Sequence, residues 1–419
     1  MTQTGLLLPR PAPVLIGFDY DRTRDASWNG VPRVFSPGRP TRRRMVWLAP
    51  PVHAGRIGED TRVTRGAVAL RAVQALLREL EVADRLTGVV GVTQGDQELL
   101  LGAFGYASRA WSIPATVETR FDTASITKLF TAVATLQLVE EGAFALDTSV
   151  IGYLGLEDTR IPPEVTPYHL LTHTSGIADD ADEEAGERYE DIFLERPNYS
   201  VIQTADYLPQ FVGKPPNFAP GEGCRYCNVG YVLLGLMIER ATGATYREYV
   251  TEHVFARAGM ARSGFLRMDV VEPDVAEGVE AIEDESGDVV GWRRNIYSYP
   301  PIGGPDGGAH VTVGDLLRFH RAVTEGRLLG PALTLELLSP KVRHSARGAG
   351  QQMGFGFEFE TDADDVVRSY WKEGMNVGVS GMLRHYPTQE ITVAVLAVGE
   401  NAAWAPIEAI HEAVGNVRT

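Results

Sequence analysis

The pattern of apolar and polar positions is clearest between residues 120 and 142, which read RFDTASITKLFTAVATLQLVEEG. Apolar side chains leave hardly any polar face here, so the segment predicts a helix that is buried on most sides. Thr123 or Ser125 can cap its start, and Gly142 suits the left-handed conformation that commonly follows a helix end. Lys128 in the first turn is costly as a buried ammonium unless it has partners.

The same reading predicts strands towards both ends of the chain. A helix at 67–83 precedes strand-like runs at 87–93 and 98–107, which a turn at 94–96 joins into a hairpin. Helical segments, among them 231–242 and 313–325, alternate with loops rich in proline and glycine. Strands return at 354–360, 377–386 and 391–398, before a helix at 405–414. This order predicts an α+β fold, in which an antiparallel sheet is flanked by N- and C-terminal helices and a mostly helical lobe is inserted.

The predicted organisation is an N-terminal extension followed by one domain. Residues 1–65 are rich in proline, arginine and glycine and show no clear periodicity, so we assign them no chemistry. The domain covers residues 66–419, with a sheet lobe at about 66–120 and 350–419 and a helical lobe at about 121–349. With 44% hydrophobic residues, this length can bury a large core.

Composition limits the partners that we expect. The formal net charge of -16 disfavours binding to a polyanion such as nucleic acid. No apolar run is long enough to span a bilayer, and the first residues, MTQTGLLLPRPAPVL, are broken by prolines instead of forming an export signal. We therefore expect a cytoplasmic protein that acts on a small molecule, with no nucleic-acid or membrane partner. The oligomeric state is not predicted.

Ser125 lies three residues before Lys128, and positions i and i+3 share one face of a helix. The serine hydroxyl can therefore reach the lysine amine. A lysine desolvated among apolar residues has a lowered pKa, and a neighbouring base activates a serine as a nucleophile. The N–H of Ser125 at the helix start is also placed to stabilise an oxyanion.

The Ser-x-x-Lys pattern has little specificity alone, because a chain of this length holds roughly one such match by chance. Ser369 and Lys372 match it too, but they lie in an alternating, strand-like stretch where i and i+3 point to opposite faces. Only Ser125 has the helical context.

Two further stretches carry candidate residues. Tyr226 and Asn228 stand just before an apolar helix, where a phenol near a lysine can serve as general acid or base. Taken alone, this stretch is better explained by an ordinary loop tyrosine followed by a capping asparagine. Lys372 stands before Gly374 at the head of a strand-like run, and a glycine on an edge strand lets a substrate carbonyl approach the backbone. By itself, a lysine such as Lys372 is more often a solvated charge than a ligand for a carboxylate.

Taken together, these segments resemble the serine hydrolases of the class C β-lactamase and penicillin-binding-protein superfamily, which includes esterases, D-amino-acid peptidases and acyltransferases. The resemblance extends from about residue 67 to the C-terminus. It rests on SITK at 125–128, YCN at 226–228 followed by GYVLLG, and KEG at 372–374. Three other stretches are typical of the same group: HLLTHTSGI at 169–177, GGPDGGAHVTVGDLLRF at 303–319 and MGFGFEF at 353–359.

The resemblance implies that Ser125 is acylated while Lys128 and Tyr226 share the general-base and general-acid steps. It also implies an oxyanion hole made by the N–H groups of Ser125 and Met375. No metal and no cofactor is expected. The candidate site thus has catalytic residues Ser125, Lys128 and Tyr226, and substrate-binding residues Asn228, Lys372, Gly374 and Met375.

The third motif departs from the common pattern of this superfamily. β-Lactamases and penicillin-binding proteins have Lys-Thr-Gly there, and many of the esterases and peptidases have His-x-Gly, whereas this chain has Lys-Glu-Gly. Glu373 puts a carboxylate where a small hydroxyl helps to hold a substrate carboxylate, which weakens the case for a β-lactam.

We therefore expect a serine hydrolase that forms a covalent acyl-enzyme from an ester or small amide. The alternatives are a β-lactamase or D-amino-acid peptidase, an acyltransferase or cyclase using the same residues, and a non-catalytic binding module with the same fold.

Other chemistries are less well supported. His169 and His173 have the i, i+4 spacing of zinc ligands, but the glutamate of HExxH is absent, so we favour a structural role in which His173 and Ser175 hold the following loop. No Gly-x-Ser-x-Gly elbow of an α/β-hydrolase occurs in the chain. Cys224 and Cys227 have no second pair, which favours packing over zinc or redox chemistry.

Overall fold

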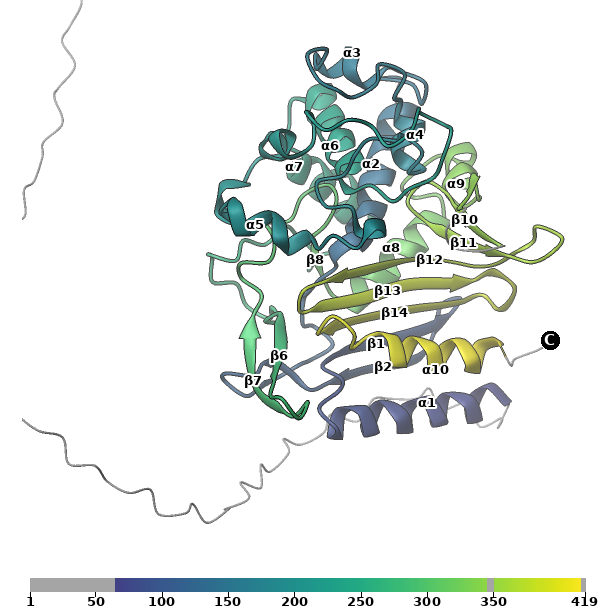
Figure 1. The fold of residues 1–419 in the computed structure, drawn as a ribbon. Helices are drawn as coiled ribbons and strands as arrows, with labels where there is room; N and C mark the ends of the chain where they lie inside the picture. The colour runs from purple at the N-terminus through teal and green to yellow at the C-terminus, as the bar shows by residue number, and fades with distance from the viewer. Residues whose placement is uncertain (1–64, 345–349, 416–419) are drawn as a thin grey trace, which may run out of the picture. The chain divides into compact units, whose positions relative to one another are not determined.

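The computed structural model describes residues 65–344 and 350–415 (Figure 1). One eight-stranded antiparallel sheet joins strands from both ends of this part of the chain, so the predicted α+β fold class is confirmed. Residues 1–64, nearly all of the predicted extension, lie outside the described residues. In spatial order the strands are β2 (Gln97–Phe104), β1 (Gly88–Gln94), β14 (Ile391–Val398), β13 (Val379–Tyr386), β12 (Val367–Asn376), β11 (Glu358–Thr361), β10 (Gln351–Met353) and β9 (Val342–Arg343).

The remaining elements are helices and short strand pairs. The helices are α1 (Arg65–Val82), α2 (Lys128–Glu140), α3 (Val150–Leu154), α4 (Pro167–Leu171), α5 (Ile192–Glu195), α6 (Asn228–Thr242), α7 (Tyr246–Val250), α8 (Val313–Thr324), α9 (Pro331–Leu337) and α10 (Trp404–Gly415). The strand pairs are β3 (Tyr106–Ser108) with β4 (Ile113–Pro114), β5 (Phe121–Asp122) with β8 (His310–Val311), and β6 (Val279–Glu283) with β7 (Val289–Arg294). None of the described helices is both long and apolar enough to cross a membrane.

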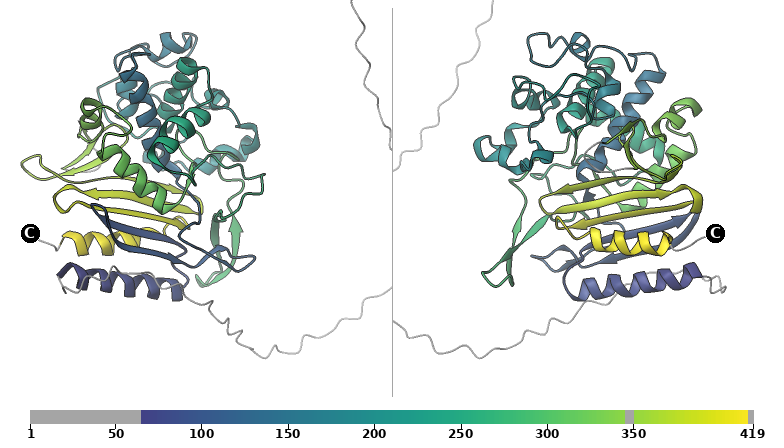
Figure 2. Two further views of the ribbon diagram at one scale, coloured as in Figure 1. Left: turned by 180° about the vertical axis from the view of Figure 1, so that it is seen from behind. Right: turned by 45° about the vertical axis from the view of Figure 1, so that its right-hand side comes forward.

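Helices cover both faces of the main sheet, and strand β14 is therefore buried along its whole length. Val395 on one face belongs to the same apolar cluster as Leu77 of α1 and Ile410 of α10. Ala394 and Leu396, on the other face, belong to the larger core that includes α2, α6 and α8. Figure 2 shows α1 and α10 on the same side of the sheet in both views.

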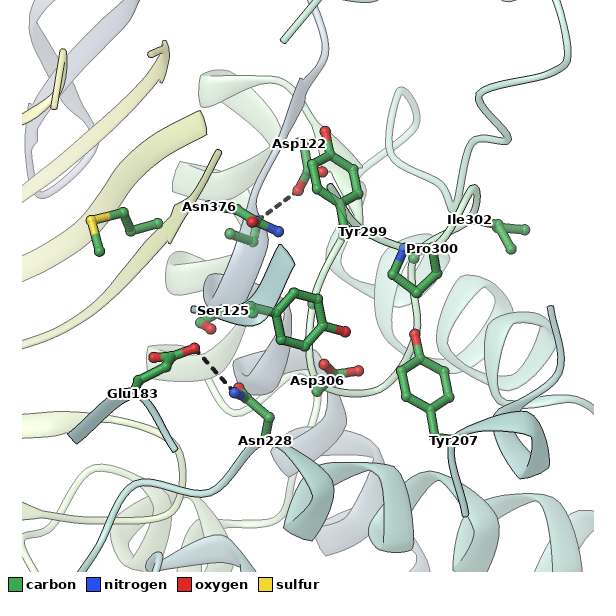
Figure 3. A pocket seen from close by; sticks show the side chains of 16 residues that line it. Asp122, Ser125, Glu183, Tyr207, Asn228, Tyr299, Pro300, Ile302, Asp306 and Asn376 are labelled. Atoms are coloured by element: carbon green, nitrogen blue, oxygen red, sulfur yellow. Dashed lines mark hydrogen bonds between the residues drawn. The ribbon is translucent and has the colours of Figure 1, made fainter. Parts of the chain in front are cut away.

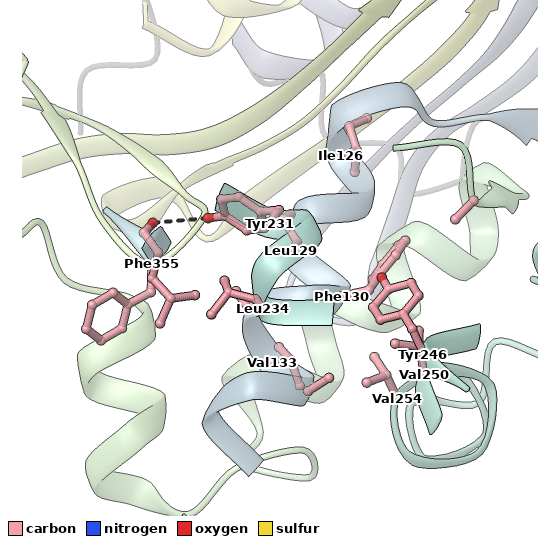
Figure 4. Packing of buried hydrophobic residues seen from close by; sticks show 14 of the residues in the cluster. Ile126, Leu129, Phe130, Val133, Tyr231, Leu234, Tyr246, Val250, Val254 and Phe355 are labelled. Atoms are coloured by element: carbon pink, nitrogen blue, oxygen red, sulfur yellow. Dashed lines mark hydrogen bonds between the residues drawn. The ribbon is translucent and has the colours of Figure 1, made fainter. Parts of the chain in front are cut away.

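Helix α2 is buried almost throughout, as its sequence predicts. Only its last residues reach the surface, and Phe130 lies among apolar side chains of neighbouring helices (Figure 4). The Phe130 ring meets Phe255 and Phe319 edge-on, with ring centroids 4.9 and 4.8 Å apart. This packing anchors the segment that carries Ser125 and Lys128.

The start of this helix differs from the sequence prediction. The α-helix begins at Lys128, and the preceding residues form a short 3₁₀ turn, η1 (Ala124–Thr127). Ala124 has φ 42°, a left-handed conformation that interrupts a helix at this point. The predicted caps are also wrong, because the Thr123 hydroxyl bonds the Ala309 carbonyl at 2.8 Å and Ser125 accepts a bond from Lys128. The predicted end at Gly142 is confirmed, with φ 76° there.

Glycines in left-handed conformations shorten two predicted strands. The run at 98–107 breaks at Gly105, whose φ is 69° and where a Cβ would lie 2.3 Å from Thr87 Oγ1. The run at 354–360 contains Gly356 with φ 85°, so β11 begins only at Glu358. In both places the chain turns where alternation alone predicts an extended strand.

Strand β12 is absent from the predicted strands, although part of it has a strand-like pattern, and it places Lys372 and Gly374 in its second half instead of at the head of a strand. Its pairing with β11 ends at Trp371, whereas its pairing with β13 continues to Asn376. The stretch from Lys372 onward therefore has a sheet neighbour only on the β13 side. Ser369 does lie on a strand with Lys372, as expected for the second Ser-x-x-Lys match.

Candidate active site

Ser125 is the second residue of turn η1 and is half-buried. A 3₁₀ turn has three residues per turn, so the side chains at positions i and i+3 lie directly above one another. This places Nζ of Lys128 3.1 Å from Oγ of Ser125. The structure therefore brings the predicted nucleophile and base into hydrogen-bond contact, through a tighter turn than the α-helix that we expected.

Lys128 is completely buried, and its amine donates hydrogen bonds to neutral oxygens of the described residues. Besides Ser125, Nζ donates to Oδ1 of Asn228 at 2.7 Å and to the carbonyl of Asp306 at 2.6 Å. Burial lowers the pKa of Lys128 to about 8, while the nearby Asp306 charge opposes this shift and the Lys372 charge adds to it. At neutral pH roughly one lysine in ten is then unprotonated, compared with fewer than one in a thousand for an ordinary lysine.

Tyr226 lies between the two lysines of the motifs. The centre of its ring is 5.0 Å from Nζ of Lys128 and 4.7 Å from Nζ of Lys372. The ring stacks on His173 with centroids 4.5 Å apart, which fixes its plane. Burial raises the pKa of the Tyr226 phenol well above 10, the charge of Glu183 raises it further, and a hydrogen bond with the Ser125 side chain lowers it. The phenol is therefore protonated at neutral pH.

Asn228 begins α6 and connects the lysine to a second loop. Its Oδ1 accepts from Lys128, and its Nδ2 donates to Oε1 of Glu183 at 3.1 Å. Its backbone N–H donates to Oδ2 of Asp179 at 2.8 Å, and the next N–H donates to Oδ1 of the same carboxylate at 3.0 Å. Asp179 thus caps α6 from a distant loop, a role that no local sequence signal indicates.

Gly374 allows β12 to touch the serine turn. A Cβ at this position would lie 2.1 Å from the Thr123 carbonyl oxygen and 3.1 Å from the Ser125 nitrogen, so a side chain would push the strand away. The next residue, Met375, lines the same cavity as Ser125. The two predicted oxyanion-hole residues, Ser125 and Met375, therefore lie on directly adjoining backbones.

Lys372 differs from Lys128 in that its amine pairs with a carboxylate. It is fully buried, is not among the residues that line the cavity, and donates to Oε1 of Glu358 at 2.9 Å. Both side chains of this ion pair are almost completely inaccessible. Glu358 lies within the MGFGFEF stretch, to which sequence reasoning gave no role.

The cavity beside Ser125 is formed by several loops around the start of α6 (Figure 3). One wall is the loop at 303–308, where Gly303 and Gly308 pack so closely that a Cβ on Gly303 would lie 2.2 Å from the Gly308 carbonyl oxygen. This loop carries Asp306, and the loop after α4 carries Glu183. Sequence reasoning missed both acids, although the 303–319 stretch stood out as typical of the superfamily.

The two histidines that resemble a zinc pair are used in other contacts. His169 hydrogen-bonds Thr166 as part of a capping box at the start of α4. His173 follows this helix with φ 58°, and its Nδ1 accepts the N–H of Cys227 at 3.1 Å. Among the described residues, no group of three or more potential ligands is arranged to hold a metal ion. Cys224 and Cys227 are buried, and their thiols contact the carbonyl oxygens of Thr172 and Ile177, each at 3.7 Å.

This fold and this site define a class of serine hydrolases, and the comparisons agree. The Beta-lactamase family model matches residues 73–412, so the chain belongs to this family. The chain is similar to the penicillin binding protein from Bacillus halodurans, with 36% identity, a TM-score of 0.74, and coverage of 80% of this chain and 99% of that one.

Two characterised relatives carry different activities in their names. Esterase EstB of Burkholderia gladioli is 29% identical over 299 residues, which are 66% of this chain and 75% of the esterase. The D-aminopeptidase of Brucella canis is 29% identical over 276 residues, 65% of this chain but only 49% of that enzyme. These matches define a serine hydrolase family without selecting one activity within it.

Proposed function

We propose that this protein is a serine hydrolase that forms a covalent acyl-enzyme at Ser125 from an ester or small amide, with mainly esterase activity. The observation that carries the proposal is the contact between Oγ of Ser125 and the fully buried amine of Lys128, at 3.1 Å. An amine with a pKa of about 8 supplies an unprotonated base at neutral pH, which a surface lysine does not.

In acylation, the neutral Lys128 amine removes the proton from Ser125 while Oγ attacks the substrate carbonyl carbon. The electron pair of the C=O bond moves to the oxygen, where the N–H groups of Ser125 and Met375 stabilise the negative charge. Collapse of this intermediate breaks the bond to the leaving alcohol. The proton that Lys128 holds passes through the Tyr226 hydroxyl to the leaving oxygen, so the amine is neutral again.

In deacylation, the same groups act on water. A water molecule gives a proton to the pair formed by Lys128 and Tyr226 and attacks the acyl carbon, and the bond to Oγ breaks. Ser125 recovers a proton, and the acid product leaves. The raised pKa of the Tyr226 phenol supports a relay that carries protons without remaining ionised. Another alcohol or amine in place of water would make the enzyme an acyltransferase with the same residues.

Two observations favour an ester or amide over a β-lactam. The charge of Lys372, which would hold a substrate carboxylate, is paired with Glu358 and buried. The cavity beside Ser125 also contains several acidic side chains, which repel an anionic substrate. The names of the esterase and D-aminopeptidase relatives support the same direction.

The test combines labelling and turnover. A fluorophosphonate should add the mass of one phosphonyl group to the intact protein and nothing to Ser125→Ala. Equal labelling of that variant would overturn the proposal. 4-Nitrophenyl acetate and butyrate should be hydrolysed much faster than a chromogenic cephalosporin. Efficient cephalosporin turnover without ester turnover would assign the protein to the β-lactamases instead.

A further inference from the structure

The cavity beside Ser125 is acidic. Among the described residues that line it there is no lysine, arginine or histidine. Its ionisable side chains are three carboxyl groups and three phenols, which belong to Asp122, Glu183, Asp306, Tyr189, Tyr207 and Tyr299. A low-dielectric cavity with this lining favours a cationic ligand over a neutral or anionic one.

The three carboxyl groups differ in their partners. Asp122 accepts the N–H of Ala124 at 2.7 Å, and Glu183 accepts from Nδ2 of Asn228 at 3.1 Å. Asp306 is only 6% exposed, and its Oδ1 is buried without a hydrogen-bond partner among the described residues. Figure 3 shows the Asp306 carboxylate between Asn228 and Tyr207. A buried carboxylate oxygen without a donor is unfavourable, so this oxygen is suited to receive one from a ligand.

Lys128 does not supply that donor. The bond between Lys128 and Asp306 is made to the backbone carbonyl, at 2.6 Å, and the other bonds of the amine go to Ser125 and Asn228. The Lys128 amine must also be neutral when it activates Ser125. Until Lys128 takes the Ser125 proton, the Asp306 carboxylate therefore has no compensating cation from this lysine, and an ammonium group on the substrate would provide one.

The position of Asp306 limits the substrate further. Its carbonyl is joined to Ser125 Oγ through a single atom, Nζ of Lys128, by contacts of 2.6 and 3.1 Å. The Asp306 side chain lines the same cavity as Ser125, so a group that binds it lies in the cavity that receives the carbonyl attacked by Ser125. Tyr207 and Tyr189 add phenol rings to this end of the cavity, and aromatic faces attract cations.

We infer that the acyl part of the substrate carries a protonated amine within a few bonds of its carbonyl, as in an amino acid ester or amide, and that Asp306 binds this amine. The inference rests on the proposed function, because it describes the acyl group that Ser125 receives. It makes Asp306 a specificity-determining residue, and the covalent steps are unchanged.

The test compares two esters that differ only in charge. In alanine benzyl ester an ammonium group occupies the position of one methyl group of benzyl isobutyrate, and released benzyl alcohol is measured for both at about pH 7, where an α-amino group is largely protonated. For one enantiomer of alanine benzyl ester, kcat/KM of the native enzyme should be about 10- to 100-fold higher than for benzyl isobutyrate. This is the range expected for one charge-assisted hydrogen bond. Equal or better turnover of the isobutyrate would overturn this inference and leave the hydrolase proposal intact. Turnover of neither ester, with no acyl adduct on Ser125, would overturn both.

Two variants test whether Asp306 causes the preference for the alanine ester. Asp306→Asn keeps the size of the side chain and should reduce the ratio of kcat/KM between the alanine ester and the isobutyrate to near unity. Loss of the Asp306 charge also affects the Lys128 amine, but that effect changes the rates on both esters together and leaves their ratio unchanged. Glu183→Gln removes an exposed carboxylate of the same cavity and should leave most of the preference. A preference that persists in Asp306→Asn, or that both variants reduce equally, would refute the assignment to Asp306. The comparison in the native enzyme needs no variant, so it decides the substrate class even if Asp306→Asn does not fold.

Discussion

Two buried lysines from different elements lie close to the same tyrosine ring, but their amines have different hydrogen-bond partners. Lys128 of α2 and Lys372 of β12 hold their amines 5.0 and 4.7 Å from the centre of the Tyr226 ring. Lys128 donates to neutral oxygens, whereas Lys372 donates to the carboxylate of Glu358. Neutral hydrogen-bond partners offset less of the cost of burying an ammonium than a paired carboxylate does. Burial alone therefore does not make a lysine a base, and the charge of its partner decides.

The largest expected effect is on stability. Lys372→Met should lower the free energy of unfolding by about 3–5 kcal/mol, because it leaves the Glu358 carboxylate buried without its cation. Urea denaturation measures the loss. The double variant Lys372→Met with Glu358→Leu should recover most of it, since it removes both charges. A loss below about 1 kcal/mol would mean that the pair behaves as a solvent-exposed one.

The matching change at the other lysine should affect chemistry. Lys128→Met keeps the apolar stem and removes the amine, and Tyr226→Phe keeps the ring and removes the hydroxyl. Each should lower kcat on a nitrophenyl ester by about 100-fold or more, the usual scale for a positioned acid or base. The double variant should be little worse than the worse single variant, because both residues serve one proton path. Tyr199→Phe, at an exposed tyrosine, is the control and should change nothing.

Fully multiplicative losses in the double variant would show that Lys128 and Tyr226 act on separate paths. Near-normal kcat in either single variant would remove that residue from the mechanism.

Gly374→Ala should give a smaller loss of activity. The new Cβ would collide with the Thr123 carbonyl at 2.1 Å, so β12 would shift away from the serine turn and carry the N–H of Met375 with it. Misplacing one oxyanion donor should reduce kcat by about 100-fold at most, with little change in KM. Gly213→Ala, where a Cβ meets open space, is the matched control. Unchanged kcat in Gly374→Ala would contradict this oxyanion hole.

The sequence predicted those features that local patterns determine. The buried α2, the helices near both ends and the central strands follow from periodicity, and Ser125, Lys128, Tyr226 and Asn228 follow from motifs. One turn of 3₁₀ helix cannot be told from the first turn of an α-helix by periodicity, so the start of α2 was misplaced. The β6–β7 hairpin was missed because its side chains are largely exposed and leave no alternating pattern.

Several acidic residues of the site escaped prediction for a different reason. Asp306 reaches Lys128 across 178 positions of the chain, and Asp179 reaches Asn228 across 49. Glu358 pairs with Lys372 between two adjacent strands whose register the sequence did not specify. Such contacts depend on how loops and strands meet in space, and a single acidic residue in a loop has no local signature.

The central claim, that Lys128 acts as a base because burial weakens its affinity for a proton, is tested most directly by the pH dependence of Ser125 acylation. Burial lowers the pKa of Lys128 to about 8, so the neutral amine becomes more abundant as the pH rises through that value. The rate of fluorophosphonate labelling, measured between about pH 6 and 10, should rise with a midpoint near pH 8 and level off about one unit above it, and this inflection should vanish in Lys128→Met. A rate that does not depend on pH, a midpoint near that of an ordinary lysine, or the same inflection in Lys128→Met would contradict the account.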